Sequence, residues 1–364
     1  MHIVIDAQLI NTAETYRGAG VSVYSQELLT ALGRHGSGLR LTAFVNDAGF
    51  SCEGVALRRT RWPAQRPLPR IVWEQTALPS ALSRLDADGV HGLVNVLPLA
   101  TSTPGVVTVH DLSFVRMPER FPAAKRFYLT QLCAASVRRA QRVIAVSRQT
   151  ANDLVHYFHV DAKKIDVVYN GVAERFKPGI RSTVLPFGGC MICYAFPALC
   201  RHAGTPQEPG TVDRRLRCLA HRPPHRIVMW PWAWLQGWFY DTIYQQVQAL
   251  GLAEMIRFPG YVPSADLPEW YRAALAFVYL SLFEGFGMPV LEAISAARLC
   301  CAAGRRGSKR WRRMQPSPSR RIRQRRWRLR STPSSPKTQY APICANAAWR
   351  MFAVSRGHAA PPKP

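Results

Sequence analysis

Three neighbouring stretches at the start of the chain decide the fold: "HIVIDA" at residues 2–7, "RGAG" at 17–20 and "VSVYSQELLTALGRHG" at 21–36. The first is compact and apolar, which predicts a buried strand. The third has apolar residues at helical spacing and ends at Gly36, a typical helix stop. A strand, a glycine loop and a helix in this order predict the first unit of an α/β domain.

The alternation of strand and helix patterns continues to residue 178. Strand-like runs recur as "LTAFV" (41–45), "GVVTVHD" (105–111), "RVIAVS" (142–147) and "IDVVYN" (165–170). Helical patterns cover residues 69–85, 122–141 and 148–158, and Ser147 is placed to cap the last of them. The pattern predicts a doubly wound parallel sheet, forming a Rossmann-like domain over residues 1–172.

A shorter α/β pattern follows in the second half of the chain. Strands are expected at "RIVM" (226–229), "IRFPGYV" (256–262) and "AFVYLS" (276–281), and helices at 240–252 and 289–296. The turn signal "YNGV" at 169–172 marks the joint between the two domains. We therefore expect a second Rossmann-like domain over 173–297, incomplete because its first strand is missing. A basic tail of low order is expected over 298–364, since apolar residues after Ala297 follow neither the helical nor the strand spacing.

The net charge of +26 comes almost entirely from two stretches. Residues 298–364 contain 18 Lys and Arg and no acid, and residues 179–226 contain seven Arg against Glu208 and Asp213. The same stretches hold seven of the nine cysteines. Because the rest of the chain is close to neutral, the charge is a weak guide to a nucleic-acid or membrane partner.

The sequence also predicts a location. The apolar run at 2–7 is too short for a signal peptide and contains Asp6, and no window reaches the roughly 18 apolar residues of a spanning helix. An odd number of cysteines without a leader favours a reducing compartment. We therefore expect a cytoplasmic protein.

Two motifs of the first domain could meet a ligand. Gly18 and Gly20 open a helix, where free backbone N–H groups and the helix dipole favour an anion; a flexible loop is the alternative. His110 and Asp111 end a strand, and ligands of open α/β sheets lie beyond the carboxyl ends of strands. A structural histidine is the alternative for His110, and it is the favoured interpretation for His91.

The stretch "FEGFGMPVLEAISA" at 283–296 is more specific. Pro289 is a typical first-turn residue, so the N-terminus of a helix would point back at residues 286–288. Glu284 lies in the preceding loop, and Glu292 lies about one turn into the helix. Carboxylates there can accept hydrogen bonds from ligand hydroxyls while backbone N–H groups take anionic oxygens. Two solvated carboxylates are the alternative.

These motifs together resemble the group 1 (family 4) retaining glycosyltransferases of GT-B fold. "SLFEGFGMPVLEAISA" at 281–296 resembles the E-x7-E motif of that family. Further segments are similar to it in the same order, among them "RGAGVSVYSQELLTAL", "VVTVHDLSFVRMPERFP", "VIAVSRQTANDLV" and "IRFPGYVPSADLPEWYRAALAFVYLSLFEGFG". The resemblance covers residues 1–178 and 236–296, roughly two-thirds of the chain.

The resemblance implies a role for each matching residue. Glu284 would hold the hydroxyls of the donor sugar, and Glu292 would contact the nucleotide ribose. His110 would lie at the reacting centre, so His110 and Glu284 are the expected catalytic residues. The other donor-binding positions would face the sugar and the phosphates: Gly18, Gly20, Phe286, Gly287 and Met288.

The reaction also follows from the resemblance. A hexose would pass with retention from a nucleotide sugar to a glycan or lipid-linked acceptor, without a metal or cofactor. "WEQ" at 73–75 resembles bacterial mannosyltransferases that use GDP-mannose in polysaccharide assembly, so mannose is the expected sugar. Such an enzyme would work in the cytoplasm, with peripheral contact at the inner membrane face as a second expected location.

One segment of the family is missing. The family carries an Arg and a Lys in a segment like "GTLEPRKNL", whose charges balance the departing diphosphate, and residues 201–211 read "RHAGTPQEPGT" in its place. Both this stretch and the tail can be back-translated so that a shifted frame yields family-like sequence. This predicts frameshifts in the coding DNA and a chain whose activity is impaired or lost.

The stretches 179–226 and 298–364 have two other interpretations. A zinc site would have to use ligands whose spacing matches no paired knuckle: Cys190, Cys193, Cys200, Cys218, His202 and His221. The Arg-rich tail could instead bind nucleic acid or an anionic membrane through its charge. A basic binding protein of this kind is the alternative to the glycosyltransferase.

Overall fold

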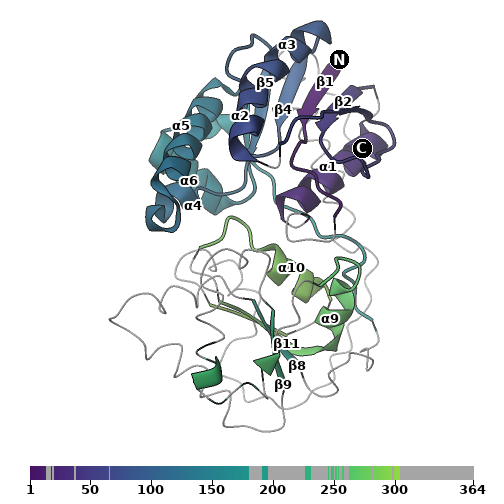
Figure 1. Cartoon of the computed structure of the whole chain (residues 1–364), viewed down its shortest axis with the longest axis vertical. Coiled ribbons are helices and arrows are strands. Elements are labelled where there is room, and N and C mark those ends of the chain that lie inside the picture. The colour runs from purple at the N-terminus through teal and green to yellow at the C-terminus, as the bar shows by residue number, and fades with distance from the viewer. Residues whose placement is uncertain are drawn as a thin grey trace. The chain divides into compact units, whose positions relative to one another are not determined.

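The computed structural model describes residues 1–13, 18, 20–36, 38–64, 66–179, 191–195, 226–230, 245, 247–249, 251, 253, 256–257, 262–280, 283–296 and 299–303. The chain forms two compact units, and the boundary between them falls between Gly171 and Val172. In Figure 1 the elements of the first unit run from purple to teal, and those of the second run from teal to green.

The first unit is built on a seven-stranded sheet whose strands all pair in parallel. In spatial order the strands are β3 (Ala56–Arg59), β2 (Arg40–Val45), β1 (His2–Asp6), β4 (Gly89–Gly92), β5 (Gly105–Val109), β6 (Arg142–Ala145) and β7 (Ile165–Val167). From β1 the chain winds first toward β3 and then, starting at β4, toward β7. The point at which the winding changes direction therefore lies between β1 and β4.

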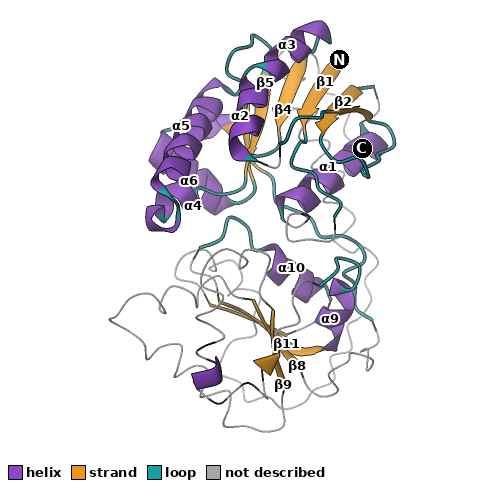
Figure 2. Ribbon diagram, in the orientation of Figure 1, coloured by secondary structure: helices purple, strands orange, loops and turns teal. Residues whose placement is uncertain are grey.

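Helices cover both faces of this sheet, as the purple ribbons on either side of the orange strands in Figure 2 show. The α-helices are α1 (Val21–His35), α2 (Pro67–Gln75), α3 (Ala77–Arg84), α4 (Ser113–Arg116), α5 (Ala123–Arg139) and α6 (Arg148–Phe158). The 3₁₀ turns η2 (Pro118–Arg120) and η3 (Ala162–Lys164) complete the unit. The doubly wound parallel sheet predicted from the sequence is confirmed.

Alternating side chains of each strand supply the cores on the two faces. Val4 packs with Leu78 of α3 in one cluster, while its neighbours Ile3 and Ile5 pack with Leu29 of α1 in the other. Successive strand residues point to opposite faces, so a continuous apolar run is what a strand covered on both sides requires. The run "HIVIDA" is therefore explained by burial on both faces.

One predicted helix is broken in two. The pattern over 69–85 corresponds to α2 and α3, which meet at Thr76 with φ −121° and ψ −60°. Pro79, in the first turn of α3, has no N–H for the carbonyl of Gln75, and its ring would clash with that carbonyl in a continuous helix. The proline therefore ends α2, although the apolar spacing continues across it.

The second unit contains a five-stranded parallel sheet. Its strands, in spatial order, are β10 (Ile256–Arg257), β9 (Arg226–Trp230), β8 (Met191–Ala195), β11 (Ala274–Leu280) and β12 (Leu299–Ala303). The expectations that the first strand is missing and that no strand follows Ala297 are therefore wrong. "MICYA" and "LCCAA" are short apolar runs, which suffice for a strand inside a parallel sheet, but their Arg- and Cys-rich surroundings concealed them.

Two helices pack a small core in the second unit, α9 (Leu267–Ala273) and α10 (Met288–Ser295). Tyr271 and Phe277 are fully buried at its centre, with ring centroids 5.3 Å apart in an edge-on arrangement. Residues 304–364, and with them nearly all of the predicted basic tail, lie outside the described residues. Within the described part of the chain, no helix has the length and apolar character needed to cross a bilayer.

Candidate functional site

His110 directly follows β5 and is fixed from several sides. Its ring Nε2 lies 2.9 Å from the carbonyl oxygen of Leu93, and its backbone N–H donates to Oδ1 of Asn95 at 3.1 Å. A carbonyl can only accept, so Nε2 carries the proton, and the lone pair of Nδ1 remains as an acceptor. The ring of Tyr24 packs edge-on against the imidazole, with the two ring centroids 4.6 Å apart.

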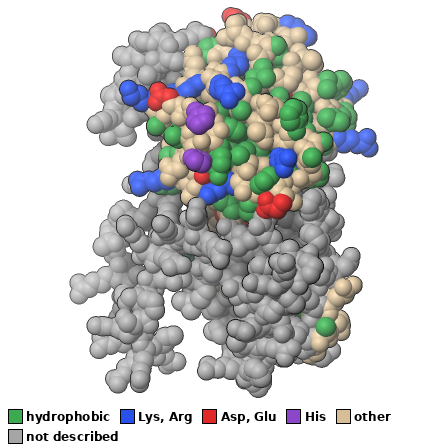
Figure 3. All heavy atoms as spheres, turned by 90° about the vertical axis from the view of Figure 1, so that its left-hand side faces the viewer, with side chains coloured by type: hydrophobic (Ala, Val, Ile, Leu, Met, Phe, Trp, Pro, Cys, Tyr) green, Lys and Arg blue, Asp and Glu red, His purple; other side chains and the backbone are tan. Residues whose placement is uncertain are grey.

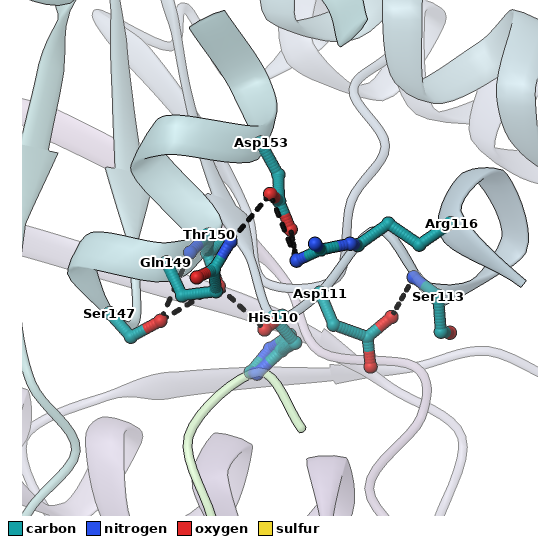
Figure 4. A network of polar contacts seen from close by, with 8 residues as sticks. All are labelled: His110, Asp111, Ser113, Arg116, Ser147, Gln149, Thr150 and Asp153. Carbon is teal, nitrogen blue, oxygen red and sulfur yellow. Dashed lines mark hydrogen bonds and ion pairs between the residues drawn. The ribbon is translucent and has the colours of Figure 1, made fainter. Parts of the chain in front are cut away.

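The first turn of α6 anchors the backbone at this position (Figure 4). Ser147 caps the helix as predicted, because its Oγ accepts from the N–H of Thr150 at 3.1 Å. The hydroxyl of Thr150 in turn donates to the carbonyl of His110 at 3.3 Å. The helix cap and the histidine therefore form one connected unit.

The same network holds a partly buried ion pair. Arg116 of α4 contacts both carboxylate oxygens of Asp153 of α6 at 3.2 Å, and Gln149 donates to the same carboxylate at 2.7 Å. Asp111 accepts from the backbone N–H of Ser113 at 2.8 Å and so stabilises the start of α4 (Figure 4). These contacts fix the loop that follows β5.

Burial sets the charge of the two histidines. Desolvation lowers the pKa of His110, although the hydrogen bond to Leu93 and the charge of Asp111 act in the opposite direction, so the ring is neutral near pH 7. Burial, and to a lesser extent His110, lower the pKa of His91 to about 4. Nε2 of His91 contacts the hydroxyl of Thr108 at 3.0 Å inside the sheet. This placement agrees with the structural role expected for His91.

The two glycines before α1 are required by the backbone. Gly20 has φ 60° and ψ −108°, a conformation that side chains other than glycine rarely adopt. A Cβ on Gly18 would lie 2.7 Å from the carbonyl oxygen of Ala13. The helix begins at Val21, so the glycine loop lies at a helix N-terminus as predicted, while its contact with a diphosphate stays a prediction.

The loop between β11 and α10 has the predicted form, with one shift. The helix begins at Met288, one residue earlier than expected, and Pro289 is its second residue. Gly287 precedes it in the left-handed conformation, with φ 85° and ψ 52°. Glu284 and Phe286 are half-buried in the loop before the helix.

Glu292 is buried rather than solvated. Only 7% of the residue is exposed, and the hydroxyl of Tyr271 donates to its Oε2 at 2.9 Å. Burial raises the pKa of Glu292 to about 7, while the hydrogen bond from Tyr271 and the charge of Arg175 act to lower it. Tyr271 and Arg175 were not predicted from the sequence; the position of Tyr271 one helix before the E-x7-E stretch was the available signal.

The residues of "WEQ" perform three different tasks. Trp73 packs edge-on against Phe44 in the core, with ring centroids 5.2 Å apart. Gln75 accepts from the N–H of Leu99 and donates to the carbonyl of Leu97, both at 3.0 Å, and so holds the segment after β4. Glu74 is buried and lines a small pocket near the end of β1.

Basic side chains are dispersed on the face of the first unit shown in Figure 3. The blue side chains there lie among green apolar and tan polar ones and do not gather in one patch. Among the described residues, no cluster of three or more His, Cys, Asp or Glu side chains could hold a metal ion. Of the six candidate zinc ligands, only the backbone of Cys193 in β8 lies within the described ranges.

Comparison with known proteins agrees with this arrangement. The model of glycosyltransferase family 4 matches residues 18–175, and the model of glycosyl transferases group 1 matches residues 236–308. The O-antigen chain mannosyltransferase B of Escherichia coli is 29% identical over 194 residues, which are 52% of this chain and 50% of that protein. The chain thus spans about half the length of this curated relative.

Solved glycosyltransferases share the fold. A sucrose-phosphate synthase of Thermosynechococcus elongatus is similar with a TM-score of 0.64 and 18% identity, covering 83% of this chain and 80% of its own. The Anabaena protein HepE, solved with UDP-glucose, is similar with a TM-score of 0.57 and 17% identity over the same shares. The fold and the two matching models together define a glycosyltransferase of GT-B fold. The chain belongs to the group 1 (family 4) glycosyltransferases.

Proposed function

We propose that the protein transfers a hexose, with retention, from a nucleotide sugar to a glycan or lipid-linked acceptor, and that GDP-mannose is the donor. The observation that supports this most is the loop of Glu284 at the N-terminus of α10, with Gly287 in the left-handed conformation. Such a loop combines backbone N–H groups for phosphate oxygens with a carboxylate for sugar hydroxyls. Mannose is suggested by "WEQ" and by the likeness to an O-antigen mannosyltransferase.

In this proposal Glu284 holds the hydroxyls of the donor sugar, and Glu292 contacts the ribose. On donor binding, a ribose hydroxyl would either replace Tyr271 as the hydrogen-bond partner of Glu292 or bind the carboxylate beside it. The neutral His110 would offer the lone pair of Nδ1 to a hydroxyl near the reacting carbon. The backbone around Gly18 and Gly20, together with that of residues 286–288, would face the diphosphate, and no metal would be needed.

In this proposal the stretch 179–226 limits the activity of the chain. We propose that it replaces the Arg and Lys that balance the charge of the leaving diphosphate. Removing one partner of a desolvated charge pair costs about 2–5 kcal/mol, and about 1.4 kcal/mol corresponds to a tenfold change. Loss of both cations would therefore reduce transfer by several orders of magnitude.

A transfer assay tests this function. The chain is compared with a version in which the reading frames of 179–226 and 298–364 are restored, using GDP-mannose and UDP-glucose with glycan and lipid-linked acceptors. The restored chain is expected to transfer hexose, detected by mass spectrometry, with retention established by NMR of the product anomer. Salt-dependent DNA binding that disappears on deletion of 298–364, without nucleotide-sugar binding by either chain, would instead establish the basic binding protein.

A further inference from the structure

A small pocket lies where the winding of the first sheet changes direction. Its walls come from residues 6–9 at the end of β1, from Val94 and Val96 after β4, from Ser25 of α1 and from Glu74 of α2. Its enclosed part has room for a group about the size of one water or hydroxyl. Open α/β sheets bind ligands at this position, between the carboxyl ends of the two strands from which the sheet winds in opposite directions.

Two buried polar atoms that line the pocket lack a hydrogen-bond partner in the described part of the chain. Gln8 is 1% exposed and Glu74 is 6% exposed, and among the described residues neither Nε2 of Gln8 nor Oε2 of Glu74 has a hydrogen-bond partner. Buried polar atoms are nearly always paired, because an unpaired one loses its hydration without compensation. These two atoms therefore indicate a ligand group that can both accept and donate hydrogen bonds, as a hydroxyl does.

Two hydrogen bonds on the side away from the pocket set the orientation of the Gln8 amide. Asn46 donates to the hydroxyl of Thr60 at 3.4 Å, and that hydroxyl donates to Oε1 of Gln8 at 3.2 Å. Oε1 of Gln8 accepts the last of these hydrogen bonds. The NH₂ group of the same amide is therefore the part that can donate to a ligand. The amide is thus an oriented donor at the pocket wall.

The charges around the pocket do not favour a cation. Nε of Arg70 lies 3.2 Å from Oε1 of Glu74, so a positive charge already lies beside the carboxyl groups of Glu74 and Asp6. Burial raises the pKa of Asp6 to about 6, and burial together with the charge of Asp6 raises the pKa of Glu74 to about 8, although Arg70 acts in the opposite direction. The Glu74 carboxyl is therefore largely protonated near pH 7. An oriented amide donor, a neutral carboxyl and an apolar wall of Val94 and Val96 instead suit a sugar hydroxyl with its neighbouring C–H groups.

We propose that this pocket binds one hydroxyl of the acceptor sugar, with Nε2 of Gln8 donating a hydrogen bond to its oxygen and Oε2 of the Glu74 carboxyl hydrogen-bonded to the same hydroxyl. The proposal rests on the proposed function, since a sugar acceptor is what a glycosyltransferase must hold beside the donor. Gln8 and Glu74 would then determine which acceptor sugar is bound, and Glu74, the central residue of "WEQ", would contact the acceptor rather than the donor.

Direct binding of simple sugars to the full chain tests the proposal. Methyl α-D-mannopyranoside, α-D-glucopyranoside and α-D-galactopyranoside are titrated separately and followed by saturation-transfer NMR. The variants are Gln8→Leu and Glu74→Met, with Gln131→Leu and Glu53→Gln as controls at exposed positions of the same unit. At least one sugar is expected to bind, and each pocket variant should weaken it about tenfold or more while the controls do not.

Thermal unfolding of the same variants separates binding from folding. Gln8→Leu gives up the hydrogen bond from Thr60, and Glu74→Met gives up the contact with Arg70, so both variants should melt at a lower temperature than the native chain. Lost sugar binding by variants that still unfold in one cooperative transition supports the proposal. Unchanged sugar affinity in both variants would mean that the pocket holds only water and would overturn it.

A separate titration with GDP-mannose distinguishes the two proposals. If GDP-mannose binds but none of the three sugars does, the pocket assignment is wrong and the proposed function is unaffected. If a sugar binds through Gln8 and Glu74 but no nucleotide sugar binds, the pocket assignment is supported and the proposed function fails.

Discussion

The candidate residues of the two units are held in different ways. His110 follows a strand in the interior of a sheet and is fixed by Leu93, Asn95 and Thr150, which lie 17, 15 and 40 residues away in the sequence. Glu284 and Gly287 belong to a local loop at the start of α10, whose shape is set by neighbouring residues. A strand-end site therefore depends on the pairing of the whole sheet, whereas a helix-start site is largely encoded within a dozen residues.

The largest effect tests whether the two units keep separate cores. Phe277 is fully buried in β11, so Phe277→Ala should destabilise the second unit by about 3–5 kcal/mol. Hydrogen exchange resolved by segment should show faster exchange in β11 and α10, and unchanged exchange in β1 and β5. Val167→Ala, at a residue 38% exposed, is the control with little effect. Equal loss of protection in both units would contradict separate cores.

Glu292 should give the second unit a stability that falls as pH rises. Its pKa of about 7 in the folded state exceeds the ordinary 4.5, so the folded state binds more protons between these values and loses stability as pH increases through them. The full effect is about 3 kcal/mol. Denaturant unfolding from pH 4.5 to 7.5 should show this slope in the native chain and lose it in Glu292→Gln.

The exposed Glu174→Gln variant of the same unit is the control and should retain the slope. A slope that persists unchanged in Glu292→Gln would show that Glu292 does not titrate as described.

His91 should produce the opposite slope in the first unit. Burial lowers its pKa to about 4 from 6.5, so the unfolded state binds more protons between these values and stability is lost as pH falls through them. The expected contribution is again about 3 kcal/mol at most. His91→Gln keeps a side-chain N–H for Thr108 but cannot titrate, and it should lose this acid sensitivity. Retained acid sensitivity would rule out His91 as its source.

The smallest effect concerns the cap that anchors His110. Ser147→Ala removes the acceptor of the Thr150 N–H and should cost about 1 kcal/mol. Because Thr150 also donates to the carbonyl of His110, the NMR signals of the His110 ring should shift, whereas Ser147→Asp should restore both. A stability loss without any change at His110 would show that the cap and the histidine are not connected.

The features that could be predicted from the sequence are those set by neighbouring residues, whereas features that depend on residues distant in the sequence could not be predicted. Five of the seven strands of the first unit, the cap at Ser147 and the glycine before α10 were readable because their signals are local. The strands β3 and β4, of four residues each, were not predicted. The contacts that orient His110, the partner Tyr271 of Glu292 and the pocket at Gln8 join residues distant in the sequence and leave no periodic signal. The strands β8 and β12 were missed because their Arg- and Cys-rich surroundings obscured two short apolar runs.

The central claim is that the loop before α10 holds a nucleotide sugar. Calorimetric titration of GDP-mannose and UDP-glucose into the full chain and its Glu284→Gln variant tests it most directly, with Glu174→Gln as the matched control. At least one nucleotide sugar is expected to bind, and Glu284→Gln should weaken its binding about tenfold or more, because a charge-assisted hydrogen bond is lost. Equal affinity in both proteins, or no binding by the native chain, would contradict it.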